Sequence, residues 1–174
     1  MTGIKTILDT PWFRLEAIPY TSRNGSTEPY YCISQHDGVV IIALTVDGDF
    51  ILVRQERLPL GRPTVEVPAG FMDGNETPEA AARRELYEET GYIADEVNYL
   101  GPGRSLMNRI NSHEHMIFIT GAVKDPDFQA REDIEPIVVR PGRFREMIEN
   151  GEFEQMSALA VLFIIGQKFG RTIL

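Results

Sequence analysis

Residues 70–91 read GFMDGNETPEAAARRELYEETG, and this stretch decides the fold. Thr77 is of a residue type that caps helix N-termini. Pro78 follows at the first helical position, where its missing N–H costs nothing. Gly91 suits the position just past a helix C-terminus. The pattern predicts a helix over residues 78–90, preceded by a polar loop.

Acidic residues crowd this helix. Glu85, Glu88 and Glu89 are spaced three and four residues apart, so their carboxylates share one side of the helix. Like charges there repel, and near the C-terminal end they also oppose the helix dipole. A hard divalent cation would offset this cost, because Mg²⁺ and Mn²⁺ favour carboxylate oxygens and bridge them to substrate phosphates. The alternative is a solvated acidic face balanced by Arg83 and Arg84.

The wider pattern favours the metal site. Gly70, Glu76 and the run Arg84 to Gly91 match the signature box of the Nudix hydrolases, G-x5-E-x7-R-E-U-x-E-E-x-G-U, at every position but the last. There the chain has Tyr92 where an aliphatic residue is usual, a departure that touches packing rather than ligation. By this box the chain is identified as a member of the Nudix hydrolases, and the resemblance covers residues 12–169.

The resemblance implies the Nudix fold and a Mg²⁺-dependent hydrolysis of a nucleoside diphosphate linked to another group, with Mn²⁺ left open as the metal. Carried over by position, Glu85, Glu89 and the backbone carbonyl of Ala69 are metal ligands, and Glu88 is a further ligand or the base. Arg84 resembles the box arginine that orients the glutamates through charge-assisted contacts. The implied mechanism is attack of a metal-activated water on one phosphorus.

The flanks of the box resemble the branch of ADP-ribose pyrophosphatases, which also hydrolyse other nucleoside diphosphate sugars. The matching segments are residues 66–70 (EVPAG), Pro102-Gly103 and residues 54–57 (RQER). The expected reaction is ADP-ribose to AMP and ribose 5-phosphate. The substrate-binding candidates are Arg54, Arg57, Glu66 and Trp12, and the alternative for the arginines is surface ion pairing with Glu56 or Glu66.

The general base stays open. The branch often carries an acidic pair, Glu-x-Glu, before the strand predicted at residues 134–139, but here Ala130 replaces the first acid and Glu132 matches the second. The candidates for the base are therefore Glu132, Glu88 and Glu114.

Glu114 lies between two histidines. His113 and His115 would share one face of a strand and could bind a metal, but no third soft ligand lies nearby in the sequence. The alternative is that they are polar residues at a strand entry, in contact with the sugar.

The order of strands, helix, strands and helices predicts an α+β fold, an α/β/α sandwich with a mixed sheet between helices. An N-terminal antiparallel β-hairpin precedes it, with strands within residues 12–18 and 30–33 around the turn at residues 23–26. The other predicted strands are residues 38–44, 50–57, 64–71, 97–100, 116–122 and 134–139; further helices are predicted at residues 143–150 and from a cap at Ser157.

Length and composition predict one domain over residues 1–174. The resemblance implies a hairpin region at 1–36 and a catalytic core at 37–174 within it. The net charge of −9 argues against nonspecific binding to nucleic acid. No apolar run is long enough to span a membrane and the start lacks a signal peptide, so we expect a cytoplasmic protein. The single cysteine, Cys32, excludes an internal disulfide framework and Cys-rich zinc sites.

Aromatic residues crowd the hairpin region, where a nucleobase could stack or a partner could bind. They are Trp12, Phe13, Tyr20, Tyr30 and Tyr31. The branch resemblance implies that this region contacts a second copy, which predicts a homodimer with a shared active site. Two alternatives to the sugar substrate stay open: another nucleotide, such as a nucleoside triphosphate or dinucleoside polyphosphate, and a sensor that binds nucleotide sugars without hydrolysing them.

Overall fold

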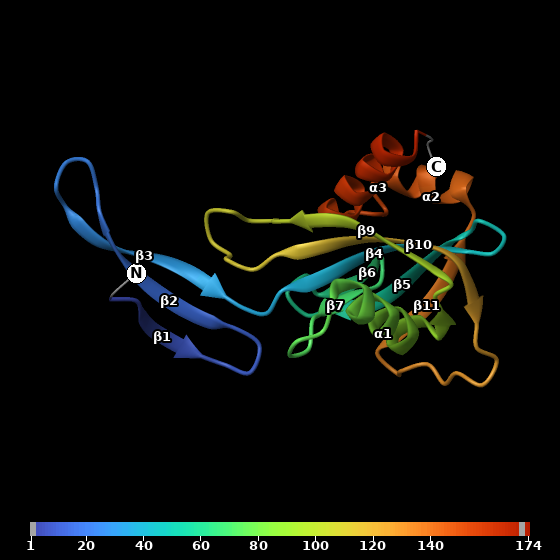
Figure 1. Ribbon diagram of the computed structural model, residues 1–174, viewed down its shortest axis with the longest axis horizontal. Helices are drawn as coiled ribbons and strands as arrows, with labels where there is room; N and C mark the ends of the chain where they lie inside the picture. Colours follow the sequence, from blue (N-terminus) through green and yellow to red (C-terminus); the bar gives the residue numbers. More distant parts are fainter. Residues whose placement is uncertain (1–2, 171–172) are drawn as a thin grey trace.

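The computed structural model describes residues 3–170 and 173–174, and its strands form an N-terminal sheet and a larger central sheet (Figure 1). The N-terminal sheet is antiparallel and contains β1 (Lys5–Asp9), β2 (Arg14–Thr21) and β3 (Thr27–Ser34). The β2–β3 hairpin confirms the prediction. β1 is an additional strand that the sequence pattern does not predict, because its five residues offer too little alternation to detect.

The N-terminal sheet has almost no core of its own. Among the described residues of β1, β2 and β3, the buried side chains are those of Ala17 and Cys32 alone. Large apolar side chains of this region are exposed instead: Ile4, Ile7, Leu8, Trp12, Tyr20, Tyr30 and Tyr31. In Figure 1 this sheet projects from the rest of the molecule. A sheet of three strands needs an apolar face or a packed neighbour to be stable on its own.

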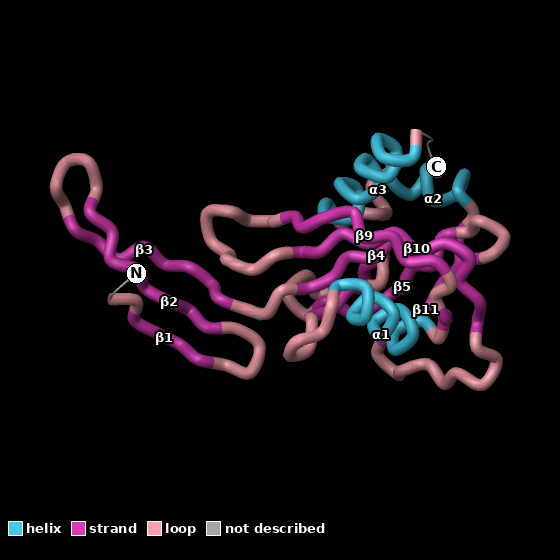
Figure 2. Tube along the Cα trace, in the orientation of Figure 1, coloured by secondary structure: helices cyan, strands magenta, loops and turns pink. Residues whose placement is uncertain are grey.

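The central sheet is mixed, as predicted. Its main path runs β11-β5-β4-β10-β8, with β6 beside β5, β7 beside β4 and β9 beside β10. Figure 2 draws the strands of both sheets in magenta and the helices in cyan. β10 pairs in parallel with β4, whereas the other pairs are antiparallel. The strand bounds are β4 Gly38–Thr45, β5 Phe50–Arg57, β6 Arg62–Glu66, β7 Ala69–Phe71, β8 Tyr92–Ile93, β9 Glu96–Gly103, β10 Glu114–Lys124 and β11 Ile134–Val139.

Helices cover both faces of this sheet, α1 (Pro78–Thr90) on one and α2 (Pro141–Glu149) with α3 (Met156–Phe169) on the other. The strand period of two divides β4 between the two cores. Its even-numbered residues, such as Ile42, pack with α2 and α3. Its odd-numbered residues, such as Ile41, pack with Leu86 of α1. This arrangement confirms the α/β/α sandwich.

The ends of α1 are those the sequence predicts. The Oγ1 of Thr77 accepts a hydrogen bond from the backbone N–H of Ala80 at 3.2 Å. Gly91 ends the helix with a φ of 67°, and its N–H bonds the carbonyl of Tyr87 at 2.7 Å. A Cβ on Gly91 would lie 2.2 Å from the ring of Phe128, so this position has neither the backbone angle nor the space for a side chain.

The sequence predicts a short strand within residues 64–71 that Pro68 and Gly70 stop. The structure confirms the stop at Pro68, but residues after it form a second strand with a different partner. β6 pairs with β5 and β7 pairs with β4. Between them Pro68 has no N–H for a ladder, and the N–H of Val67 bonds the side-chain Oε1 of Gln155 at 2.9 Å. The break places Ala69 and Gly70 beside a different strand from Glu66.

The predicted cap of the last helix is wrong. α3 starts at Met156, after Gln155, whose side chain accepts the N–H of Val67 instead of capping its own helix. Ser157 therefore lies inside the first turn. α2 begins at Pro141, two residues before the predicted start, because proline fits the first helical position. Within the described residues, the helices fall short of the length and apolarity that a bilayer crossing requires.

Candidate active site

Arg84 fastens the loop before α1 to the helix itself. Its guanidinium donates to both carboxylate oxygens of Glu76, at 3.1 and 3.0 Å, and to the carbonyl of Phe71 at 2.9 Å. It also donates to Glu85 at 2.8 Å. The hydrogen bonds from Arg84 lower the pKa of Glu76 below its usual value. Arg84 thus sets the position of Glu85, while Glu76 serves to hold the loop.

Glu85 lies against the backbone of β7. A Cβ on Gly70 would fall 2.1 Å from the carboxyl carbon of Glu85, so the carboxylate occupies the space that any side chain at Gly70 would need. Burial raises the pKa of Glu85 above its usual value, with Arg84 acting in the opposite direction. The glycine at this position is required by the close approach of a carboxylate to the chain.

Glu89 is the most buried acid of the site, with 8% of its surface exposed. Its Oε2 accepts a hydrogen bond from the backbone N–H of Ala69 at 3.2 Å. Burial raises the pKa of Glu89 to about 7; this hydrogen bond and the charges of Arg57 and Arg131 oppose the rise, and the charge of Glu85 adds to it. A bound cation would favour the ionised form.

The donor set fits a hard divalent cation. Glu85 and Glu89 reach the backbone of residues 69–70 from one side of α1, and carboxylate and carbonyl oxygens are the ligands that Mg²⁺ and Mn²⁺ prefer. Over residues 3–170 and 173–174, no three His, Cys, Asp or Glu side chains are already gathered as a metal-binding group. Glu85 instead pairs with Arg84 at 2.8 Å, and Glu88 lies 3.5 Å from the same guanidinium.

Arg57 and Glu66 form a two-pronged ion pair next to these acids. The guanidinium of Arg57 donates to both oxygens of Glu66, at 2.7 and 2.6 Å, and Thr64 donates to the same carboxylate. The charge of Glu89 contributes to raising the pKa of Arg57, after the hydrogen bonds to Glu66. Arg54 lies earlier on β5 than Arg57. Its guanidinium pairs with the carboxylate of Glu135 at 3.0 Å on the surface.

Glu132 lies on the loop between β10 and β11, which runs past α1 (Figure 1). Residues 130–136 of this loop and strand line an open cavity of about 440 Å³, together with Arg54 and its neighbours on β5. The loop also carries Arg131, which donates to Asp133 at 3.1 and 2.9 Å. Sequence reasoning missed Arg131, although it stands between the two positions of the Glu-x-Glu pattern.

Glu114 is not brought to the acids of α1. On β10 it is in phase with Met116 and lines a cavity with Val161 of α3, on the face of the sheet opposite α1. The structure therefore separates this candidate base from Glu85 and Glu89.

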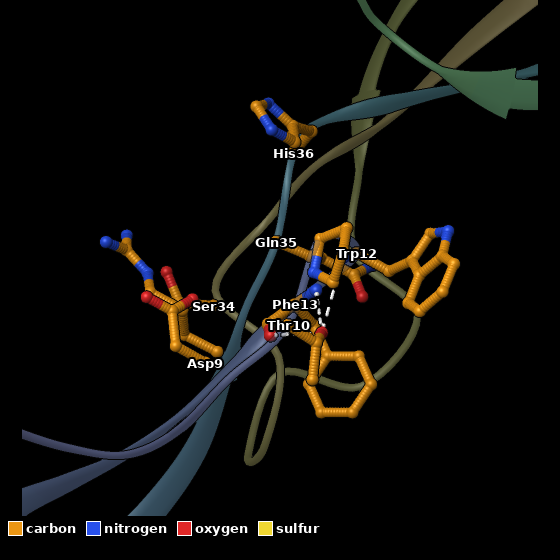
Figure 3. A pocket seen from close by; sticks show the side chains of 9 residues that line it. Asp9, Thr10, Trp12, Phe13, Ser34, Gln35 and His36 are labelled. Carbon is orange, nitrogen blue, oxygen red and sulfur yellow. Dashed lines mark hydrogen bonds between the residues drawn. The ribbon is translucent and has the colours of Figure 1, made fainter.

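Trp12 lies in the turn between β1 and β2, with 68% of its surface exposed. Figure 3 shows it with Phe13 and His36 around a cavity of about 360 Å³. Within the described part of the chain, the lining of this cavity comes from residues 9–14 and 34–36, and no residue of α1 or β7 contributes.

The two histidines around Glu114 face a carboxylate. His113 Nδ1 and His115 Nε2 lie 3.3 and 3.5 Å from the same oxygen of Asp37. The hydroxyl of Tyr99 bonds the other ring nitrogen of His115 at 2.9 Å. These contacts satisfy the imidazoles as polar groups at a strand entry.

Several known proteins resemble this chain. The family model described as NUDIX domain matches residues 34–158. An ADP-ribose pyrophosphatase of Bacillus subtilis is 40% identical over 85 residues, which are 46% of this chain and 46% of that protein. An ADP-sugar pyrophosphatase of Mus musculus is 36% identical over 103 residues, 53% of this chain and 47% of that protein. These matches therefore span less than half the length of either relative.

Two longer matches are weaker in sequence. A GDP-mannose pyrophosphatase of Yersinia pestis is 26% identical over 184 residues, covering 97% of this chain and 85% of that protein. A crystal structure of an ADP compounds hydrolase superposes with a TM-score of 0.80 over 95% of this chain and 91% of that chain, at 19% identity. The structural match supports the fold.

Proposed function

The chain belongs to the NUDIX family, and from this premise we propose that it is a pyrophosphohydrolase that cleaves the diphosphate of a nucleoside diphosphate sugar with a divalent metal. One observation carries the proposal. Glu85 and Glu89 reach the backbone of residues 69–70 from α1, and Arg84 fixes both that helix and the loop before it. A site that binds anions without a metal ion would not bring several carboxylates together in this way.

Each residue of the proposed site would have its own role in hydrolysis. Glu85, Glu89 and the carbonyl of Ala69 would hold the metal, Mg²⁺ first and Mn²⁺ second, with Glu88 as a further ligand. When bound, the metal supplies the positive charge and Lewis acidity that diphosphate hydrolysis needs. Arg84 positions Glu85 rather than touching the substrate.

The base that accepts the proton of the attacking water is Glu88 or Glu132. Glu88 is half exposed on α1, and Glu132 lines the cavity opposite Arg54. Glu114 is set aside because it faces α3.

ADP-ribose is the leading substrate. Hydrolysis would add water across one P–O bond of the diphosphate and release AMP and ribose 5-phosphate. The names of the relatives from Bacillus subtilis and Mus musculus favour an ADP-sugar, and that of the Yersinia relative keeps GDP-mannose in the comparison. The proposed residues for binding the diphosphate or the sugar are Arg54, Glu66 and Arg57, the last through the nitrogen that Glu66 does not engage.

We further propose that the working form is a homodimer. The N-terminal sheet exposes a set of apolar and aromatic side chains that a second copy would cover. In such a pair, Trp12 of one copy would stack on the base of a nucleotide held by the other. Light scattering over a hundredfold range of concentration tests this, and a monomer mass throughout would refute it.

The function is tested with a hydrolysis panel of ADP-ribose, ADP-glucose, GDP-mannose, UDP-glucose and nucleoside triphosphates, with Mg²⁺ or EDTA and products identified by mass. We expect one diphosphate sugar to be preferred, with turnover lost in EDTA and in Glu89→Gln. Glu149→Gln, an exposed change on α2, is the matched control and should keep full activity. Folded protein that binds a nucleotide sugar but turns none over would support a sensor instead.

A further inference from the structure

The arginines near Glu89 differ in how firmly they are held. Arg84 has bonds to Glu76, Glu85 and the carbonyl of Phe71. Arg57 is bound through two nitrogens to Glu66, whose side chain is only 13% exposed. Neither guanidinium can leave its partner without stranding a partly buried carboxylate.

Arg131 is held differently. Its partner is Asp133, two residues away, and the two side chains are 55% and 64% exposed. An ion pair open to water contributes little stability, because both charges are well solvated when apart. The guanidinium of Arg131 can therefore exchange Asp133 for another anion at small cost.

The loop that carries Arg131 is anchored to the end of α1. The N–H of Asp125 bonds the carbonyl of Gly91 at 2.9 Å, and the ring of Phe128 packs on that of Tyr87 with centroids 5.5 Å apart. Beyond this anchor the chain passes the cavity shared with Arg54 and then enters β11. Arg131 thereby lines the same cavity as Arg54 and Glu132, which are proposed to bind the diphosphate and to accept the proton of the attacking water.

We propose that Arg131 binds a non-bridging phosphate oxygen of the substrate's diphosphate, releasing Asp133 as it does so. The inference rests on the proposed function, because it concerns the diphosphate that this function assigns to the site. A guanidinium presents a planar pair of N–H donors that fits two oxygens of a phosphate as well as those of a carboxylate. The diphosphate can therefore take the place of Asp133 with the same hydrogen-bond geometry. Asp133 then acts as a built-in competitor that lowers the affinity of the site for diphosphates.

Opposite effects of two substitutions test this. ADP binding is measured by titration calorimetry in Mg²⁺ at constant ionic strength. Arg131→Ala should weaken ADP binding by about tenfold, the usual order for one charge-assisted hydrogen bond. Asp133→Ala should strengthen it by about twofold to fivefold, since it removes an exposed competing pair. Arg131→Lys should fall between Arg131→Ala and the unmodified protein, since it keeps the charge and loses the fork.

Arg143→Ala is the control, because Arg143 forms a similar exposed pair with Glu152 on the side of α2. It should leave ADP affinity unchanged. If Arg131 and Asp133 only stiffen the loop, both alanine variants will change the affinity in the same direction, and the proposal is overturned. An unchanged affinity in Arg131→Ala overturns it as well. Opposite shifts in ADP affinity without turnover of any panel substrate would uphold the Arg131 contact and reject the hydrolase.

Discussion

Glu89→Gln should stabilise the ion-free protein at neutral and alkaline pH. Glu89 is almost fully buried, and its pKa rises from 4.5 to about 7 chiefly because of that burial. The folded state therefore prefers the protonated acid, and the wild type loses stability as the pH rises from 4.5 through 7. Glutamine is neutral, has the same shape, and keeps an oxygen to accept the N–H of Ala69.

The magnitude follows from the shift. A rise of about 2.5 units, from 4.5 to about 7, corresponds to about 3 kcal/mol once the acid is fully ionised. The free energy of unfolding of Glu89→Gln should thus exceed that of the wild type by about 3 kcal/mol at pH 8 to 9, and by almost nothing near pH 4.

Urea denaturation in EDTA between pH 4 and 9 measures this difference, at one protein concentration. Glu149→Gln, at an exposed position of α2, should show no such dependence on pH. Added Mg²⁺ should raise the free energy of unfolding of the wild type by mass action, and it should raise that of Glu89→Gln less. If the difference in free energy of unfolding between Glu89→Gln and the wild type does not change with pH, the reasoning is refuted.

Three other substitutions probe the same region. Gly70→Ala places a Cβ about 2.1 Å from the carboxyl carbon of Glu85, so kcat should fall at least about a hundredfold while the circular dichroism spectrum is retained. Arg84→Lys loses the paired contacts to Glu76 and should lower the free energy of unfolding, measured in urea, by about 2 kcal/mol. An unchanged urea midpoint would contradict the role of Arg84 in holding the loop to α1. Thr77→Ala removes the helix cap and should lower thermal stability by about 1 kcal/mol, with Thr77→Ser restoring it.

The sequence predicts α1 and the N-terminal hairpin well because the signals are local. A capping threonine, a proline at the first turn and a terminal glycine define the helix within a few residues. The box then places Glu85 and Glu89 on one side of it. The roles assigned to those side chains remain predictions.

Features that depend on distant contacts were not predictable. The start of α3 depends on Gln155 bonding Val67, far away in the chain. The position of Arg131 depends on Phe128 filling the space beside Gly91. Likewise, alternation along β10 groups Glu114 with Met116, but no local signal says which face of the sheet α1 will cover.

The scarcity of buried side chains in the N-terminal sheet has an evolutionary consequence. With Ala17 and Cys32 as the buried side chains of its described strands, most other positions there can mutate at little cost to the packing of a single copy, so the constraint on them comes from whatever covers the sheet. The region matched by the family model begins at residue 34, where β3 ends and the constrained core starts. A lineage can therefore vary the N-terminal sheet together with the surface that covers it, while the packed residues around Arg84 change less freely.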